Sequence, residues 1–260
     1  MQQTIHKPKS DFDARASSQM ERHLDMPSWT ERQKLALSCR MLAKEEHGSG
    51  IAGQITARGE QAGTMWTARF GLGLEEIRAS DFLLVDDDLN VLEGDGMPNP
   101  SNRFHRWIYR NRPNVNSIMH THPPHVSALS MIGVPLKVSH MDTSMFYEDC
   151  AFLDHWPGPP IGDEEGELIS TALGDKRAIL LAHHGQLCAS STVEESAVLS
   201  LAFERAARLQ LLAMAAGTIK DIEPEHARQA HDYRLKPKPL CATFHYFARQ
   251  VLREDSDCLN

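Results

Sequence analysis

Two histidine pairs are the groups in this sequence best suited to bind a metal ion. His120 and His122 stand two residues apart at the end of an apolar run, and His183 and His184 follow a second apolar run. Alternate residues of a strand leave the same face, so both members of the first pair point to one side. Adjacent residues point to opposite faces, so only one member of the second pair can join them. The spacing predicts a three-histidine metal site, and the alternative is a structural pair of buried histidines.

The composition narrows the class of protein. The chain has 260 residues, 14 histidines, and 35 acidic against 27 basic side chains, for a formal net charge of −8. This acidity argues against a nucleic-acid partner, which requires a basic face. No apolar run approaches the roughly 20 residues of a membrane span, and the first residues lack the apolar core of a secretory signal. Five cysteines without a CxxC motif favour the reducing cytoplasm.

The histidines require an α/β scaffold to position them. Residues 1–27 are polar and aperiodic, and predict a flexible N-terminal arm. Ser28 and Glu31 match a capping box, which predicts a helix from there to about Gly48. We expect one α/β domain over 28–217 and a helical extension of the same domain over 218–260.

The remaining elements follow from periodicity and turn residues. Strands are expected within 49–58, 64–71, 81–95 (two strands), 115–122, 135–140 and 178–182, and helices over 99–112, 125–132, 163–173, 192–217, from 223 and from 241. The stretch 141–166 is predicted to be a long loop.

Several segments, in order, resemble the class II aldolase/adducin head family, which includes the fuculose-phosphate and ribulose-phosphate aldolases and epimerases. The similar segments are SGIAGQITAR, FHRWIYRNRPNVNSIMHTH, ILLAHHGQL and TVEES. The resemblance implies a three-layer α/β/α fold with a central, mostly antiparallel sheet. It also implies a homotetramer with sites at subunit interfaces. A divalent metal, zinc first and manganese or iron as alternatives, would bind His120, His122 and His184, which leaves His183 a structural role.

The sequence departs from the sugar-phosphate aldolases in the segment before the helix at 104–112. Ser101 stands where the family has its catalytic glutamate, and a hydroxyl cannot replace a carboxylate as general base. Asn99 and Pro100 replace the two serines that hold the substrate phosphate. Gln54 replaces an asparagine of the glycine-rich turn, and Thr56 keeps a hydroxyl there. These changes predict a substrate without a phosphate group.

Other residues are candidates for the remaining roles. Arg58 and Arg69 flank the glycine-rich turn and are candidates to clamp a carboxylate, or are surface arginines. His125 is a candidate acid or base, or a helix cap. His140 is a candidate fourth ligand or proton shuttle, and Tyr147 lies close to the position of the family's catalytic tyrosine. Gln54, Thr56 and Ser101 complete the expected substrate-binding set. Asp142, Glu148 and Asp149 are expected in a solvated acidic loop, and the alternative is that one of them replaces the lost glutamate. His105 is expected at the edge of the core.

These observations predict a cytoplasmic metal-dependent lyase of the class II aldolase type. Its substrate would be a small carbonyl or carboxylate compound, and its reaction aldol cleavage or decarboxylation, because three neutral ligands leave the ion strongly Lewis acidic. The first alternative is an Fe(II)-dependent oxygenase or decarboxylase acting on a hydroxyaromatic acid, as the resemblance allows. The second is a non-catalytic scaffold like adducin, which the retained histidines disfavour.

Overall fold

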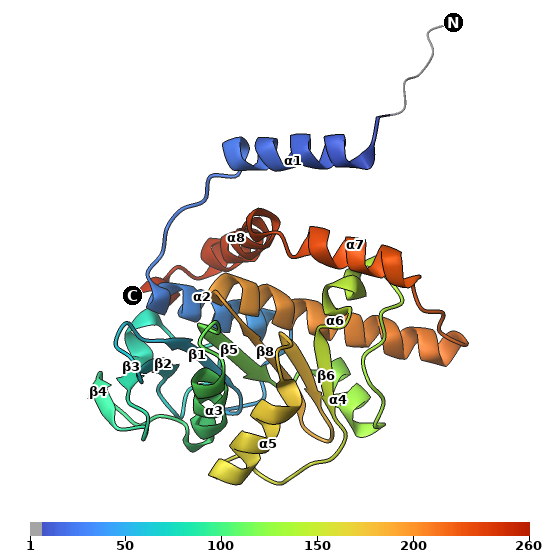
Figure 1. The fold of residues 1–260 in the computed structure, drawn as a ribbon. Helices are drawn as coiled ribbons and strands as arrows, with labels where there is room; N and C mark the ends of the chain where they lie inside the picture. The colour runs from blue at the N-terminus through green and yellow to red at the C-terminus, as the bar shows by residue number, and fades with distance from the viewer. Residues whose placement is uncertain (1–6) are drawn as a thin grey trace, which may run out of the picture.

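The computed structural model describes residues 7–260 and contains an eight-stranded sheet at its centre (Figure 1). The strand order is β4-β3-β2-β1-β5-β8-β7-β6. Every neighbouring pair is antiparallel except β6 and β7. The strands are β1 (Gln54–Arg58), β2 (Met65–Ala68), β3 (Phe82–Val85), β4 (Val91–Glu93), β5 (Ser117–Thr121), β6 (Cys150–Leu153), β7 (Ala178–Leu181) and β8 (Gly185–Ser190). The expected mostly antiparallel sheet is confirmed.

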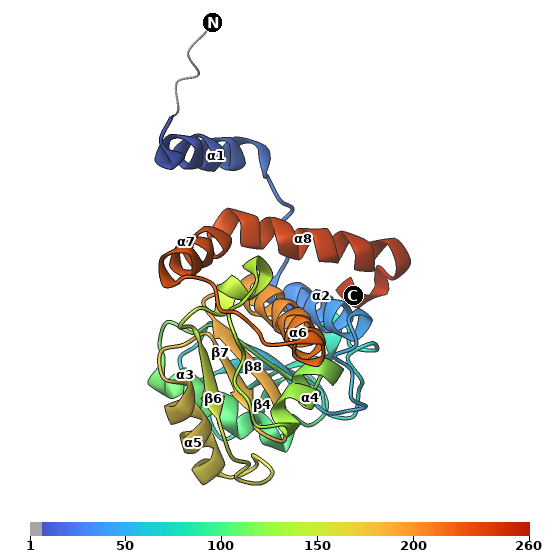
Figure 2. The same cartoon turned by 90° about the vertical axis from the view of Figure 1, so that its right-hand side faces the viewer.

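Helices cover both faces of the sheet, as the sequence predicted, and make the molecule three-layered (Figure 2). One face carries α2 (Glu31–Lys44), α4 (Pro124–Met131) and α6 (Val193–Ala216), with α8 (Pro237–Glu254) packed on α2 and α6 further from the sheet. The other face carries α3 (Arg103–Asn111) and α5 (Asp163–Leu173). The shorter α7 (Pro224–Arg234) packs on η3 (Met141–Phe146); the other 3-10 turns are η1 (Ala79–Asp81), η2 (Pro100–Asn102) and η4 (Asp257–Leu259).

The central strand β5 shows how alternation builds both cores. Met119 faces the core under α2, α6 and α8, whereas Ile118 faces the core under α3 and α5. Because His120 follows two residues after Ile118, its side chain lies on the α3 face. There the ring of Phe104 from α3 contacts the His120 ring edge to face, with centroids 5.1 Å apart.

The start of α2 and the segment 135–140 differ from the sequence predictions. The cap of α2 is Thr30, not Ser28: its hydroxyl accepts the Gln33 N–H at 3.3 Å and the Gln33 side chain accepts the Thr30 N–H at 3.1 Å. This box follows the same pattern two residues further along the chain. The segment 135–140 was wrongly predicted as a strand. Its Lys137 N–H instead donates to the Gln210 side chain of α6 at 2.7 Å.

The long loop predicted over 141–166 was wrong in extent, because it contains η3 and β6. The parallel pairing of β6 with β7 gives this short strand its partner. Strand β8 was not predicted. No element was expected between residue 182 and the helix at 192–217, whereas Gly185–Ser190 pairs with both β5 and β7.

The predicted N-terminal arm contains a helix, α1 (Lys9–His23). This helix was not predicted because the segment is polar and lacks a regular pattern of apolar residues. Within this helix no side chain is buried. Asp13 pairs with Lys236, the residue before α8, at 2.6 Å, and Glu21 pairs with Lys238 of α8 at 3.4 Å. Both views place α1 beyond α8, away from the sheet (Figures 1 and 2). Residues 1–6 of the arm lie outside the described residues, and the division of the chain into arm, domain and extension stays a prediction.

Candidate metal centre

The structure brings His120, His122 and His184 together. His120 lies in β5, His122 follows its last residue, and His184 lies in the turn between β7 and β8. The antiparallel pairing of β5 with β8 sets Thr121 opposite Gln186, which brings this turn to the end of β5. Two segments far apart in sequence thereby meet at the same end of these interior strands of the sheet.

The three rings converge on a common point. The Nε2 atoms of His120 and His122 are 2.9 Å apart, and one ring nitrogen from each histidine lies within 4.8 Å of the other two. The ring centroids are 4.6 to 4.8 Å apart. Two nitrogens bound tetrahedrally at about 2.0–2.1 Å from zinc would be roughly 3.3 Å apart, so the pair needs only a small adjustment to hold an ion.

The backbone of the turn decides which histidine of the second pair joins. His183 has a φ of 56°, in the left-handed region, and its N–H donates to the Ser130 carbonyl at 3.3 Å. His183 is exposed, whereas His184 is half-buried together with His120 and His122. Gly185 permits the close approach, because a Cβ there would lie 2.5 Å from the Thr121 carbonyl oxygen. His183 therefore has a structural place in the turn.

Burial keeps the three imidazoles neutral. His120 is 1% exposed, and desolvation, followed by the neighbouring histidines, lowers its pKa well below 6.5. Desolvation also lowers the pKa of His122, and it lowers that of His184 to about 4. The neutral ring is the form that binds a metal. Within the described residues the cluster contains three histidines and no carboxylate, a donor set that fits a borderline divalent ion such as zinc.

Of the predicted substrate-binding residues, Gln54 lies nearest the triad in the sheet. It pairs directly with His120 across β1 and β5, and its side chain is 8% exposed. Thr56, two residues further along β1, is fully buried. Its hydroxyl is 2.8 Å from Nδ1 of His105 and 2.9 Å from the Tyr109 hydroxyl. These bonds tie Thr56 to α3.

The two predicted arginine clamps are engaged elsewhere. Arg58 lies at the far end of β1 from Gln54, donates to the main-chain carbonyls of Val115, Tyr109 and Arg112, and stacks on the Tyr109 ring. Arg69 forms an ion pair with Asp81 at 2.9 Å. The structure does not bring either guanidinium to the triad.

Ser101 lies in η2, just before α3. Its N–H donates to the Asn99 side chain at 3.0 Å, which caps this turn. The Ser101 N–H is therefore already bonded within this turn.

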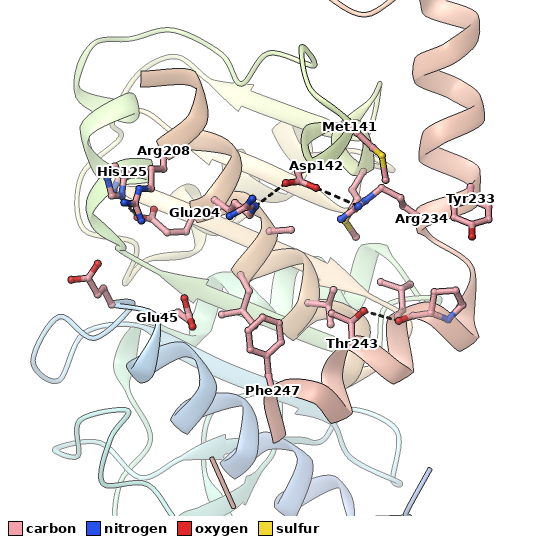
Figure 3. Close-up of a pocket in the computed structure, with 18 residues that line it drawn as sticks. Glu45, His125, Met141, Asp142, Glu204, Arg208, Tyr233, Arg234, Thr243 and Phe247 are labelled. Carbon is pink, nitrogen blue, oxygen red and sulfur yellow. Dashed lines mark hydrogen bonds and ion pairs between the residues drawn. The ribbon is translucent and has the colours of Figure 1, made fainter. Parts of the chain in front are cut away.

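Of the three predicted catalytic residues, one lines a different cavity of about 430 Å³, between α6, α8 and η3 (Figure 3). The triad lies outside the set of described residues that line this cavity. His125 lines it, and its Nδ1 is 2.5 Å from the Glu204 carboxylate, which also accepts the N–H groups of His125 and Val126. Glu204 thus caps α4.

His140 caps η3: its Nδ1 accepts the Asp142 N–H at 3.1 Å. Tyr147 ends this turn and stacks under Arg228. Asp142, expected to be solvated, instead pairs with Arg205 at 2.8 Å, and in Figure 3 it lies between the arginines that line the cavity. The catalytic roles of His125, His140 and Tyr147 stay predictions.

Several buried polar residues where β5 meets β8 were not among the predicted site residues. The main-chain carbonyl of Gln186 lies 2.8 Å from Nδ1 of His120, and the Gln186 side chain donates to Thr121 and Ser200. His47 is also buried there, with Nδ1 2.9 Å from the Thr121 hydroxyl. The signal for Gln186 was its position two residues after His184, in a strand that the analysis did not predict.

Comparisons with known proteins agree with this architecture. The family described as Class II Aldolase and Adducin N-terminal domain matches residues 33–211. The 4-hydroxy-3-prenylphenylpyruvate oxygenase/4-hydroxy-3-prenylbenzoate synthase of Streptomyces roseochromogenus subsp. oscitans is 31% identical, over 69% of this chain and 66% of that protein. The 3,4-dihydroxyphthalate decarboxylase of Arthrobacter keyseri is 30% identical, over 74% and 82%.

Solved structures show the same fold. The L-fuculose 1-phosphate aldolase from Glaciozyma antarctica PI12 superposes with a TM-score of 0.82 at 24% identity, over 91% of this chain and 98% of that one. Among residues 7–260, no helix is both long and apolar enough to cross a membrane.

Proposed function

Because the chain belongs to the class II aldolase and adducin family, we propose that it is a metal-dependent carbon–carbon lyase. Its substrate would be a small carbonyl or carboxylate compound without phosphate. The observation that carries this proposal is the set of three neutral imidazoles, His120, His122 and His184, within 4.8 Å of one another. Zinc is the first choice of ion, with manganese or iron as alternatives.

The site suits a reaction in which a bound ion accepts electron density from the bond that breaks. A divalent ion there would supply a Lewis acid that polarises a chelated carbonyl and stabilises the enolate left by C–C cleavage. The chain itself orients His120 through the Gln186 carbonyl and excludes water around its fully buried ring. Decarboxylation needs the electron sink but no enolising base, which suits a chain with Ser101 at the glutamate position.

The segment before α3 supports a substrate without phosphate. Pro100 has no amide hydrogen to donate, and the Ser101 N–H, a possible donor to a phosphate oxygen, is already donated to the Asn99 carboxamide oxygen. The similarity to a 3,4-dihydroxyphthalate decarboxylase supports decarboxylation over aldol cleavage. We further propose a cytoplasmic homotetramer. The location rests on five cysteines that are all unpaired, and the assembly rests on the family.

A second candidate is an Fe(II)-dependent oxygenase, favoured by the similarity to a 4-hydroxy-3-prenylphenylpyruvate oxygenase. Three neutral histidines suit Fe(II) as well as zinc. A non-catalytic scaffold is disfavoured, because three converging imidazoles without an ion would desolvate polar groups for no gain.

The deciding experiment is metal analysis of protein purified without chelators, with parallel assays of CO₂ release from 3,4-dihydroxyphthalate and of O₂ uptake. Zinc or manganese near one ion per chain supports the lyase, and oxygen-sensitive iron with O₂ uptake supports the oxygenase. The double variant His120→Ala/His122→Ala should lose the ion, and the exposed His155→Ala should retain it. If the wild type contained no metal and the double variant bound added metal with unchanged affinity, both enzyme hypotheses would be contradicted. Turnover of fuculose phosphate at millimolar concentration would contradict the claim about phosphate.

A further inference from the structure

The cavity of about 430 Å³ between α6, α8 and η3 is large enough for a small molecule, since ligand sites in proteins are typically ~300–1,000 Å³. It lies on the α6 side of the sheet, whereas the ring of His120 lies on the α3 side. None of the three triad histidines lines it. The cavity is therefore a candidate binding site separate from the metal centre.

Part of the cavity wall is apolar. Val198, Leu201 and Ala202 line it from α6, and Leu240 and Phe247 line it from α8. Val198, Leu201 and Leu240 belong to the main core and are only 5 to 8% exposed. Phe247 is partly buried, and its ring projects from α8 into the cavity (Figure 3). An apolar group of a ligand would be removed from water against these side chains, which is favourable in proportion to the area buried.

The opposite wall carries two arginines that share one carboxylate (Figure 3). Arg205 Nε donates to one Asp142 oxygen at 2.8 Å, and Nη1 of Arg234 lies 3.5 Å from the other. The hydrogen bond from Arg205 lowers the pKa of Asp142, so this carboxyl group is ionised at neutral pH. One negative charge between two guanidinium groups leaves a single positive charge without a counter-ion at this wall.

Arg234 has too few acceptors for a guanidinium that is only 27% exposed. Its Nη1 contact with Asp142 is long, and Nη2 lies 3.5 Å from the sulfur of Met145, which is a weak acceptor. Its Nε is buried without a partner among the described residues. Because poorly satisfied donors are costly in a partly buried position, a carboxylate that bonded the terminal nitrogens would be bound favourably.

The other carboxylates of the cavity do not neutralise the arginine wall. Glu204 is already engaged by the His125 ring and by the N–H groups of His125 and Val126. Glu45 lies at the far end of the cavity from Arg234 (Figure 3). The end of the cavity at Arg234 is therefore positive, and its charge matches that of a monoanion.

We propose that this cavity binds a small carboxylic acid with an apolar body, of which an arylalkanoic acid is the simplest example. The carboxylate would pair with Arg234, and the body would lie between α6 and Phe247. A single positive charge beside an apolar wall fits a monocarboxylate better than a doubly charged phosphate ester. The proposal does not depend on the proposed function, because the triad takes no part in it.

The test compares three probes. The first, 3-phenylpropionate, has both features; 3-phenylpropionamide lacks the charge, and propionate lacks the ring. An NMR titration of the wild type would follow the methyl signals of Val198, Leu201 and Leu240. The first probe should shift these signals with a Kd of roughly 1 mM or lower, as expected for a ligand of its size. The other two should bind at least roughly tenfold more weakly.

Variants locate the site. Arg234→Leu should weaken binding of 3-phenylpropionate at least roughly tenfold and leave 3-phenylpropionamide unchanged. Arg228→Leu is the matched control, because it lies on the same helix but does not line the cavity. Ala202→Phe should fill the cavity and abolish binding of both probes, and the exposed Ala213→Phe on the same helix should not. Circular dichroism checks the fold, and the two variants lie on different helices in case one fails to fold.

The outcomes separate this proposal from the proposed function. The double variant His120→Ala/His122→Ala should bind 3-phenylpropionate as the wild type does, and loss of binding there would overturn the cavity site. Equal binding of acid and amide, unchanged binding in Ala202→Phe, or no methyl shifts at roughly 10 mM probe, tenfold above the expected Kd, would also overturn it. A wild type that took up no metal but bound 3-phenylpropionate at these methyl groups would contradict the proposed function alone.

Discussion

The Nδ1 atom of His120 lies 2.8 Å from the main-chain carbonyl oxygen of Gln186. The Nδ1–H is therefore donated to β8, and the lone pair on Nε2 is directed toward His122, whose Nε2 is 2.9 Å away. Because a backbone carbonyl makes this contact, the pairing of β5 with β8 orients the ligand independently of the Gln186 side chain.

The first prediction concerns this tautomer. In His120→Asn the carboxamide can still donate to the Gln186 carbonyl, but the Nε2 ligand is removed. Zinc affinity should fall by more than the roughly 10–100-fold typical of changes outside the ligands, as measured by competition with a chromophoric chelator. The control Gln186→Met keeps the carbonyl and should stay within about tenfold of wild type. An unchanged affinity in His120→Asn would remove His120 from the metal centre.

The second prediction concerns Arg58, which sequence analysis proposed as a carboxylate clamp. Its three bonds to main-chain carbonyls and its stacking on Tyr109 tie β1 to the end of α3. Arg58→Ala should lower the free energy of unfolding by about 2–4 kcal/mol, measured in urea, and leave zinc affinity unchanged. Arg69→Ala, which removes a half-exposed ion pair with Asp81, should cost about 1 kcal/mol or less. If Arg58→Ala weakened the binding of a 2-hydroxy acid such as lactate to the zinc-loaded protein without destabilising the fold, Arg58 would be a carboxylate-binding residue after all.

These cases show which parts of the protein local sequence could predict. Alternation placed His120 and His122 on one side, and the family resemblance selected His184. The turn explains that choice physically, because His183 takes a left-handed conformation that strand alternation does not anticipate. The type of a residue alone did not predict the partners of Arg58, because a guanidinium can bond to carbonyls, as this one does, as well as to carboxylates.

Long-range pairing accounts for most of what was missed. The role of Gln186 depends on β8 lying between β5 and β7, which no local pattern reveals. The segment 135–140 has the composition of a strand but bonds to Gln210 of α6 instead. His105 was expected at the edge of the core, and it is fully buried because α3 lies directly on β1.

The third prediction concerns Glu204, whose carboxylate receives the N–H groups of His125 and Val126 as well as the His125 ring. Glu204→Gln leaves one acceptor oxygen for these donors and removes the charge that favours a helix N-terminus. The free energy of unfolding should fall by about 1–2 kcal/mol. Hydrogen exchange should accelerate at the first turn of α4. The exposed Glu225→Gln on α7 is the control, and equal exchange in both variants would contradict the capping role.

The last prediction is a pH dependence of opposite sign at two histidines. Desolvation lowers the pKa of His47 from 6.5 to about 3, so its contribution to stability is present above pH 6.5 and is lost as the pH falls toward about 3. The hydrogen bond with Asp149 raises the pKa of His231 above 6.5 despite partial burial. Its contribution is complete below pH 6.5 and is lost as the pH rises through the raised value.

Replacing each residue by glutamine should therefore give costs that change in opposite directions. As the pH falls from about 7.5 to about 5, the destabilisation in His47→Gln should shrink and that in His231→Gln should grow. Urea unfolding of the metal-free protein at the two pH values measures both, with the wild type as reference. Metal-free protein is used so that release of an ion in acid does not contribute. If both costs changed in the same direction, desolvation would not govern His47, or Asp149 would not stabilise the protonated form of His231.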